Sequence, residues 1–384
     1  MKKYYVLIIA LFVPFWLISQ TYQIGHRLVV YTDPARNNRQ IQTEIYYPAN
    51  TAGDNVPVAS GQFPFMVYGH GFMMSWDSYK WLWDSLVPLG YIIAFPKTEG
   101  GMGPNHLEFG KDLRFLNEKI KSENNNNSSF LYQKVTNKSA IMGHSMGGGS
   151  SFLAADNYTN FTTLINFAAA NTNPSSISAA TRVTVPLLMF IGENDGVTPP
   201  ANHQIPMYDS CSSTCKTRIT IKGGGHCYFA NYNFNCSLGE MTTSPQPTIT
   251  REEQFTRVMY LLKPYLDYML KGNSSSGQLF LSRLTNNPNI TYVRHCNTSV
   301  DKQSLFPYIQ IYPNPATKNI NVLFPCFIDN VNVSIFNVLG KKIANEQFSG
   351  QTISMNFPEN TPNGIYFIHI QLGNEKYITK IIKQ

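Results

Sequence analysis

The feature that most constrains this chain is the segment Gly143–Gly149, which reads GHSMGGG and contains a G-x-S-x-G pattern. It follows a short apolar run at 140–143 and precedes small residues at 148–155, which together predict a strand, a sharp turn and a helix. The glycines let the strand and the helix pack closely, and Ser145 is then held at the corner above the sheet. We therefore predict a nucleophilic serine, against the alternative of a glycine-rich turn with an idle serine.

A serine hydroxyl is a poor nucleophile at neutral pH and needs a base. In a strand-turn-helix arrangement of this kind, the carboxylate and the histidine follow the serine in that order, each after a later strand. The apolar segment 185–191 ends in Gly192-Glu193-Asn194-Asp195, and segment 218–221 is followed by three glycines and His226. We predict that His226 is the base and that Asp195 orients it, with Glu193 as the competing carboxylate.

A nucleophilic serine of this kind also requires an oxyanion hole, which consists of two backbone N–H donors. Met146, directly after the serine, supplies one donor, and Phe72 in the loop Gly69-His70-Gly71-Phe72 supplies the other. His70 is expected to shape this loop. Tyr228 and Phe229 follow His226 and are predicted to form an apolar wall for substrate. Trp76 is either a cleft residue or, more in keeping with its helical segment, part of the core.

Residues 20 to about 296 alternate strand-like and helix-like segments, which predicts a mostly parallel sheet with helices on both faces. One helix is expected from Arg251 to Lys271, because Thr250 and Glu253 form a capping box and Gly272 can end it. Pro264 is predicted to kink this helix. The expected elements are strands at 27–31, 40–47, 63–68, 91–95, 140–143, 164–167, 187–191 and 218–221, and helices at 76–87, 107–120 and 251–271.

The pattern changes after residue 272, where Gly, Ser, Asn and Pro become frequent. Short strands are expected at 320–324, 331–336, 353–357, 365–372 and 377–382, with no helix pattern between them. Such a run of short strands and turns predicts a small β-sandwich. The expected organisation is a signal peptide at 1–19, a catalytic domain at 20–300, a linker at 301–308 and the β-sandwich at 309–384.

Export is predicted from the N-terminus, where Lys2 and Lys3 precede an apolar run from Val6 to Ile18. This run is too short to cross a bilayer core of about 30 Å comfortably, so a signal peptide is favoured over a membrane anchor. Six cysteines fit an exported protein. Local spacing favours the pairs Cys211–Cys215 and Cys227–Cys236, and leaves Cys296 and Cys326 unpaired.

Charged residues make up only 14% of the chain, and the basic residues behind its net charge of +7 are dispersed. This distribution argues against a nucleic-acid binder. There is no Cys-x-x-Cys pair and no spacing typical of metal ligands. We therefore expect no metal and no cofactor, and we expect a monomer.

At these residues the chain resembles the cutinase-type polyester hydrolases, including those that act on poly(ethylene terephthalate). The likeness covers roughly residues 25–272 and rests on three segments: Gly143–Gly149, Val185–Asp195 and Gly224–His226. It implies the α/β-hydrolase fold, a triad of Ser145, Asp195 and His226, and Phe72 and Met146 as oxyanion donors. It also implies Val197 as a neighbour of the substrate. These enzymes usually carry a tryptophan in the stretch that corresponds to 168–175, which has none here.

The C-terminal segment resembles the type A sorting domain of the type IX secretion system of Bacteroidota. The matching pieces are Tyr312–Pro315, Ile335–Gly340, Pro362–Tyr366 and the lysine-bearing end at 379–384. The resemblance implies passage across the outer membrane by the type IX machinery, followed by removal of the domain. The alternative is an ordinary carbohydrate- or protein-binding β-module.

Taken together, the sequence predicts a secreted serine esterase that cleaves polyesters or other accessible hydrophobic esters. An acyl-enzyme would form on Ser145 and would be hydrolysed by water that His226 activates. Two alternatives stay open. One is a lipase or small-ester hydrolase of the dienelactone-hydrolase-like group, acting on acylglycerols or acetylated carbohydrates. The other is a surface-binding protein without catalysis.

Overall fold

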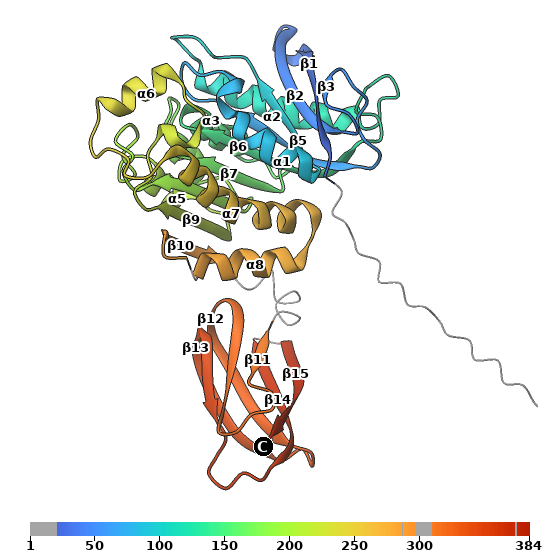
Figure 1. The fold of residues 1–384 in the computed structure, drawn as a ribbon, viewed down its shortest axis with the longest axis vertical. Coiled ribbons are helices and arrows are strands. Elements are labelled where there is room, and N and C mark those ends of the chain that lie inside the picture. Colours follow the sequence, from blue (N-terminus) through green and yellow to red (C-terminus); the bar gives the residue numbers. More distant parts are fainter. Residues whose placement is uncertain (1–20, 286, 297–308, 373–374) are drawn as a thin grey trace, which may run out of the picture.

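The computed structural model describes residues 21–285, 287–296, 309–372 and 375–384 (Figure 1). The predicted signal peptide at 1–19 and the predicted linker at 301–308 lie outside the described residues. Two units are present, each with its own apolar core: an α/β unit in the first part of the chain and a strand-only unit in the last part.

The α/β unit is built on one sheet, which has ten strands among the described residues, in the order β10-β9-β8-β7-β6-β4-β5-β2-β1-β3. The run from β5 through β4 to β9 is parallel, whereas β1, β2 and β10 are paired antiparallel. The strands are β1 (Gln23–Asp33), β2 (Arg39–Ala49), β3 (Gly53–Asp54), β4 (Phe63–Gly69), β5 (Ile92–Pro96), β6 (Val135–His144), β7 (Thr163–Phe167), β8 (Leu187–Gly192), β9 (Cys215–Ile221) and β10 (Ile290–Cys296).

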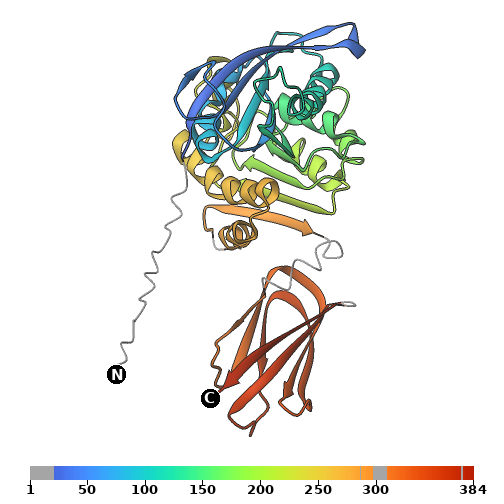
Figure 2. The same ribbon diagram turned by 90° about the vertical axis from the view of Figure 1, so that its right-hand side faces the viewer.

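Helices cover both faces of this sheet (Figures 1 and 2). Strand β4 shows why, because all its residues are buried and alternate between two cores: Phe65 and Val67 join one, and Met66 and Tyr68 the other. The first core is shared with α2 (His106–Glu123), α3 (Met146–Ala155), α4 (Ser176–Ala180) and α5 (Gln204–Ser210). The second is shared with α1 (Lys80–Leu86), α7 (Arg251–Lys271) and α8 (Ser274–Thr285). The predicted α/β architecture is confirmed.

Helix α7 has the predicted ends. The side chain of Thr250 accepts a hydrogen bond from the N–H of Glu253 at 3.1 Å, and Gly272 ends the helix with a left-handed backbone at φ 69°. The helix runs without interruption across Pro264, which is buried. The predicted aromatic helix at 76–87 is a 3-10 turn (Trp76–Tyr79), then α1, then a second 3-10 turn (Val87–Leu89).

The segment after Gly272 differs from the expectation of a loop-rich region. It forms α8 and then β10, which pairs antiparallel with β9 at the edge of the sheet. The pairing register places Cys296 opposite Cys215, and these two cysteines form a disulfide. The predicted Cys211–Cys215 pair is therefore wrong, as is the unpaired state of Cys296, because local spacing carries no information on strand register.

Of the remaining four cysteines, two form a disulfide that the sequence predicted and a third is a free thiol. Cys227 and Cys236 form the predicted disulfide. Cys211 is a free thiol, buried, and burial raises its pKa. The side chain of Cys326 lies outside the described residues.

The C-terminal unit consists of strands alone among its described residues, as predicted. Val331, Val333 and Ile335 are fully buried, in agreement with their alternation with polar residues. Two of the expected strands, 320–324 and 331–336, belong to one long strand whose register shifts at bulges. The strands are β11 (Gln310–Tyr312), β12 (Asn319–Asn337), β13 (Lys342–Asn356), β14 (Gly364–Leu372) and β15 (Glu375–Lys383).

Removing the Cys215–Cys296 disulfide should destabilise the α/β unit. The bond joins residues 81 positions apart and holds edge strand β10 on β9. We expect the double variant Cys215→Ser/Cys296→Ser to lose about 2–4 kcal/mol of unfolding free energy, because the unfolded chain regains the freedom that the cross-link removed. Urea unfolding of the variant and the parent protein measures this difference. A loss below about 0.5 kcal/mol would contradict a stapling role for this bond.

Candidate active site

Ser145 occupies the sharp turn between β6 and α3. Its backbone has φ 54° and ψ −120°, a conformation that a residue with a side chain rarely adopts and that costs free energy. Two hydrogen bonds hold it: its N–H donates to the carbonyl of Phe167 at 3.0 Å, and its carbonyl accepts from the N–H of Ala170 at 2.8 Å. The serine is nearly buried, with 9% of its surface exposed.

The glycines around Ser145 are required by close backbone contacts. A Cβ atom on Gly147 would lie 2.1 Å from the carbonyl oxygen of Gly69, at the end of β4. A Cβ atom on Gly143 would lie 2.3 Å from the carbonyl oxygen of Gly147. Both distances are far inside van der Waals contact, so no other residue fits without moving the backbone. The predicted close packing of strand, turn and helix is present.

Asp195 and His226 lie beyond the carboxyl ends of the neighbouring strands β8 and β9. The Oδ2 atom of Asp195 is 2.9 Å from Nδ1 of His226, and both side chains are buried. Because an ionised carboxylate only accepts, Nδ1 carries the proton and Nε2 keeps its lone pair. Glu193, the competing carboxylate, instead accepts the N–H of Gly223 at 2.8 Å.

Two residues that the sequence reasoning missed complete the surroundings of the aspartate. Thr198 donates its N–H to Oδ1 of Asp195 at 2.7 Å, and its hydroxyl is 2.8 Å from Oδ2. The same hydroxyl is 2.9 Å from Nδ1 of His226 and accepts from the amide of Gln204 at 2.8 Å. An aspartate followed three residues later by threonine, just after a strand, is a turn signal that could have identified Thr198.

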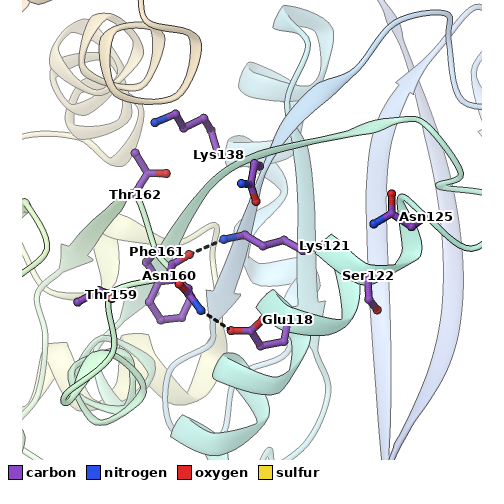
Figure 3. A pocket seen from close by; sticks show the side chains of 10 residues that line it. Glu118, Lys121, Ser122, Asn125, Lys138, Thr159, Asn160, Phe161 and Thr162 are labelled. Atoms are coloured by element: carbon purple, nitrogen blue, oxygen red, sulfur yellow. Dashed lines mark hydrogen bonds between the residues drawn. The ribbon is translucent and has the colours of Figure 1, made fainter.

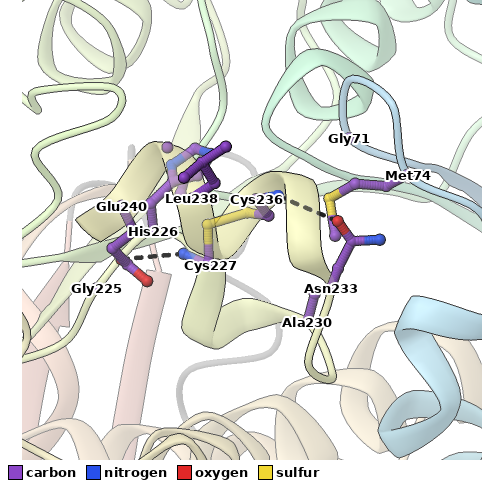
Figure 4. Close-up of a disulfide and its surroundings, with 12 residues drawn as sticks. Gly71, Met74, Gly225, His226, Cys227, Ala230, Asn233, Cys236, Leu238 and Glu240 are labelled. Carbon is purple, nitrogen blue, oxygen red and sulfur yellow. Dashed lines mark hydrogen bonds between the residues drawn. A yellow bond between two sulfur atoms is a disulfide. The ribbon is translucent and has the colours of Figure 1, made fainter. Parts of the chain in front are cut away.

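The loop that carries His226 is held on both sides, and Figure 4 shows the side of the Cys227–Cys236 disulfide. On one side, Gly225 donates to and accepts from the side-chain amide of Gln254, at 2.9 and 3.0 Å. On the other side, Cys227 is bonded to Cys236 of α6 (Phe234–Met241), and the N–H of Cys227 donates to Glu240 at 3.2 Å. Burial raises the pKa of the Glu240 carboxyl above its usual value.

His144 connects the predicted oxyanion loop to the His226 loop. The hydroxyl of Tyr79 accepts the N–H of Gly71 at 2.8 Å and is 3.0 Å from Nδ1 of His144. The Nε2 atom of His144 is 3.1 Å from the carbonyl oxygen of His226. Since that carbonyl only accepts, Nε2 carries the proton and Nδ1 accepts from Tyr79. Burial, and then the nearby His226, hold the pKa of His144 well below its usual value.

The predicted oxyanion donors lie on two different segments, the start of α3 and the loop after β4. Met146 is the first residue of α3 and is buried, whereas Phe72 is on the loop after β4 with 48% of its surface exposed. His70 is buried in the same loop, with its ring nitrogens 2.9 Å from the carbonyl oxygens of Gly71 and Thr98. It shapes the loop, as the sequence predicted. Val197 is half-buried, between Asp195 and Thr198.

The aromatic residues expected near the site take different places. Tyr228 is half-buried beneath the guanidinium of Arg251, 4.6 Å from its ring centre. Phe229 is fully buried, 5.8 Å from the ring of Phe167, and therefore belongs to the core rather than to an exposed wall. Trp76 donates to the hydroxyl of Tyr46 at 3.2 Å and lies under Lys97.

A separate open cavity of about 650 Å³ lies near the starts of β6 and β7 (Figure 3). Its lining is mostly polar and includes Glu118, Lys121, Lys138 and Asn160. It is at the amino ends of parallel strands, opposite to the ends that carry Ser145, Asp195 and His226. Ligand sites of open α/β sheets form at the carboxyl ends. The Ser145 turn is therefore the better candidate for the active site.

The mostly parallel sheet with helices on both faces, and with a serine on a strained strand-to-helix turn, defines an α/β-hydrolase. The chain belongs to the PET hydrolase-like family, whose model matches residues 36–244, more than half of its length. This match includes Ser145, Asp195 and His226. The resemblance to cutinase-type polyester hydrolases is confirmed.

Curated relatives agree with this assignment over part of their length. The chain is 25% identical to a bis(hydroxyethyl) terephthalate hydrolase of Streptomyces coelicolor over 216 residues, which cover 55% of this chain and 64% of that protein. It is 31% identical to Cutinase 1 of Thermobifida cellulosilytica over 184 residues, 47% of this chain and 64% of that protein. It is 28% identical to an endo-acting ulvan lyase of Formosa agariphila over 126 residues, 29% of this chain and 24% of that protein. The chain spans less than two thirds of each.

The last part of the chain is a secretion system C-terminal sorting domain, whose family model matches residues 310–384. This confirms the predicted type IX sorting domain and, with it, export to the cell surface or the extracellular space. In the described part of the chain, none of the helices has the length and apolar character needed to cross a membrane.

The buried His144 should make stability depend on pH. Its pKa is lowered in the folded state, so below pH about 6.5 the unfolded chain binds a proton that the folded chain does not. Stability is therefore retained above pH 6.5 and lost as the pH falls below it, by at most about 1.4 kcal/mol per pH unit from this residue. We expect His144→Asn to reduce the loss between pH 7.5 and 5.0 by up to about 2 kcal/mol, measured by urea unfolding. An unchanged pH dependence would contradict this account.

Proposed function

We propose that this protein is an exported serine esterase that hydrolyses polyesters through an acyl-enzyme on Ser145. The observation that carries the proposal is the combination of Ser145 on its strained turn with the buried hydrogen bond of 2.9 Å between Asp195 and His226, at neighbouring strand ends. Membership of the PET hydrolase-like family supports ester hydrolysis as the reaction class. No cofactor takes part in this chemistry.

The proposed reaction has two halves. In the first, Nε2 of His226 takes the proton of the Ser145 hydroxyl while the oxygen attacks the ester carbonyl, and the leaving alcohol receives that proton. In the second, His226 takes a proton from water, which attacks the acyl-enzyme, and the proton returns to Ser145 as the acid leaves. Asp195 keeps Nδ1 protonated and stabilises the imidazolium that forms in each half.

The oxyanion of each tetrahedral intermediate is assigned to the N–H groups of Met146 and Phe72. The N–H of Met146 is at the start of α3, where helix N–H groups and the helix dipole favour negative charge. The loop of Phe72 is fixed by the bonds from Gly71 to Tyr79 and from Tyr79 to His144. A donor that is fixed before the reaction needs no rearrangement when charge develops, and losing one such donor typically costs about 3 kcal/mol.

Polyesters are the proposed substrates because exposed or half-buried apolar side chains lie on the loops that carry the site residues, and because two relatives bear the names of a cutinase and a terephthalate ester hydrolase. Phe72 is half exposed, and Val197 and Tyr228 are half-buried beside Asp195 and His226. We assign these three side chains, with Met146, to substrate contact. The segment 168–175 contains no tryptophan, so this contact does not rely on a tryptophan from that segment. One chain supplies every residue of the mechanism, which fits a monomer.

Variants of the proposed triad test the function directly. We expect Ser145→Ala to lower hydrolysis of p-nitrophenyl butyrate by at least about 10³-fold, and Asp195→Asn by about 10⁴-fold, because the imidazole loses its tautomer. Glu193→Gln is the matched control, since Glu193 bonds Gly223 instead of His226, and it should stay within about twofold of the parent. Product release from amorphous poly(ethylene terephthalate) film is measured in parallel.

The film assay and the small-ester assay together distinguish a polyester substrate from a small-ester substrate. Release of soluble product from the film by the parent, and not by Ser145→Ala, supports the polyester substrate. Hydrolysis of the small ester without release from the film would contradict the polyester substrate and would favour a lipid or small-ester substrate. An unchanged rate in Ser145→Ala would overturn the serine mechanism itself.

A further inference from the structure

Helix α6, directly after the His226 loop, exposes its apolar face to solvent and buries the opposite face. Phe234, Leu238 and Met241 lie on one face at spacings of four and three residues, and 65%, 51% and 75% of their surfaces are exposed. The opposite face carries Cys236 and Glu240, of which Glu240 is buried. A surface helix normally packs its apolar face inward and exposes its polar face.

Bonds other than apolar packing hold α6 in this orientation. The disulfide to Cys227 fixes the inner face, and Glu240 accepts the N–H of Cys227 at 3.2 Å (Figure 4). Asn233 caps the start of the helix by accepting the N–H of Cys236 at 3.1 Å, and Asn235 donates to the carbonyl of Met73 at 3.2 Å. Burying a carboxylate is unfavourable unless it gains partners. The exposed apolar face is thus imposed by a covalent bond and polar contacts.

The segment that carries the exposed face is also nearly free of charged residues. Between Asn231 and Thr250 the sequence contains one formally charged residue, Glu240, and that side chain is buried on the inner face. Tyr232, 71% exposed, adds a fourth large side chain to the outer surface just before the helix. Four exposed large apolar or aromatic side chains within ten residues form a cluster, and such clusters mark interaction sites.

The helix that carries this cluster is joined to the loops of the proposed active site. Cys227, at one end of the disulfide, follows His226 in the chain. Asn235 contacts Met73, which follows the half-exposed Phe72 on the predicted oxyanion loop. A surface that lies against α6 would therefore also lie near the loops that carry His226 and Phe72, whereas a small soluble ester at Ser145 would not need α6.

We propose that the apolar cluster of Tyr232, just before α6, and Phe234, Leu238 and Met241 on its outer face docks the enzyme onto the uncharged surface of an insoluble polyester. The inference rests on the proposed function and adds to it a surface for the polymer outside the triad. The neutral character of the face selects this occupant, because an anionic membrane or a charged protein would require cations or anions that the face lacks. Apolar contact with the polymer would release water from both surfaces.

Measuring the adsorption of variants that lack the Ser145 nucleophile tests docking separately from catalysis. The variant Phe234→Ser/Leu238→Ser/Met241→Ser is made in the Ser145→Ala background, and its binding to amorphous poly(ethylene terephthalate) film is compared with that of Ser145→Ala alone. We expect the binding constant to fall at least about tenfold, because three apolar side chains are removed from the contact. The matched control is Leu28→Ser/Val30→Ser on β1, where the side chains are 50% and 49% exposed, and it should bind as the parent does.

The same triple substitution in the active enzyme gives a second readout. Release of product from the film should fall by at least about tenfold, while hydrolysis of soluble p-nitrophenyl butyrate stays within about twofold, which also shows that the variant is folded. A loss of soluble-ester hydrolysis equal to the loss on film would overturn a docking role, because it would place α6 in the site itself.

Equal adsorption of the triple variant and the parent would overturn the proposal, whether or not the film is hydrolysed. So would a loss of binding only to neutral phosphatidylcholine vesicles, or a change only in oligomeric state by sedimentation, since these outcomes assign the face to lipid or to a second copy. Failure of the proposed function is a different result, seen when the parent protein with Ser145 intact turns over no ester although its adsorption is still measurable.

Discussion

The close approach of the Ser145 turn to the end of β4 is the constraint on which the rest of the site depends. Gly147 lies so near the carbonyl of Gly69 that no side chain fits between them, and Ser145 takes a backbone conformation that is costly in isolation. Hydrogen bonds to Phe167 and Ala170 offset that cost. These contacts join the ends of β4, β6 and β7 to one turn, so the serine is placed by the sheet itself rather than by a mobile loop.

Much of the fold could be predicted because it follows from local sequence patterns, such as hydrophobic periodicity and helix-capping residues. Alternation of apolar segments with helical ones indicated the parallel strands, and the capping residues at Thr250 and Gly272 fixed both ends of α7. What escaped prediction depends on contacts between distant residues. The register of β10 on β9 sets the Cys215–Cys296 disulfide, and neither the spacing of cysteines nor the Gly/Ser-rich composition after residue 272 carries that register. For the same reason two expected strands are one bulged strand, β12.

In the candidate site, too, local patterns predicted some residues, whereas residues that depend on contacts between distant segments were not predicted. The order of serine, carboxylate and histidine along the chain indicated Ser145, Asp195 and His226, and the structure shows Asp195, not Glu193, at His226. The supporting residues were missed, because Gln204 and Glu240 acquire their roles only when separate segments meet. Phe229 shows the converse: adjacency to His226 suggested a wall, but the short 3-10 turn Cys227–Phe229 directs its ring into the core.

Covalent labelling with a fluorophosphonate, which reacts with an activated serine, tests whether Ser145 is the nucleophile of this protein. The parent protein is incubated with the probe and digested, and the modified residue is located by peptide mass spectrometry. We expect one adduct, on Ser145, that forms far more slowly in His226→Gln because the hydroxyl then has no base. An adduct on another residue, or an equal labelling rate in His226→Gln, would contradict the claim that Ser145 is the nucleophile and His226 its base.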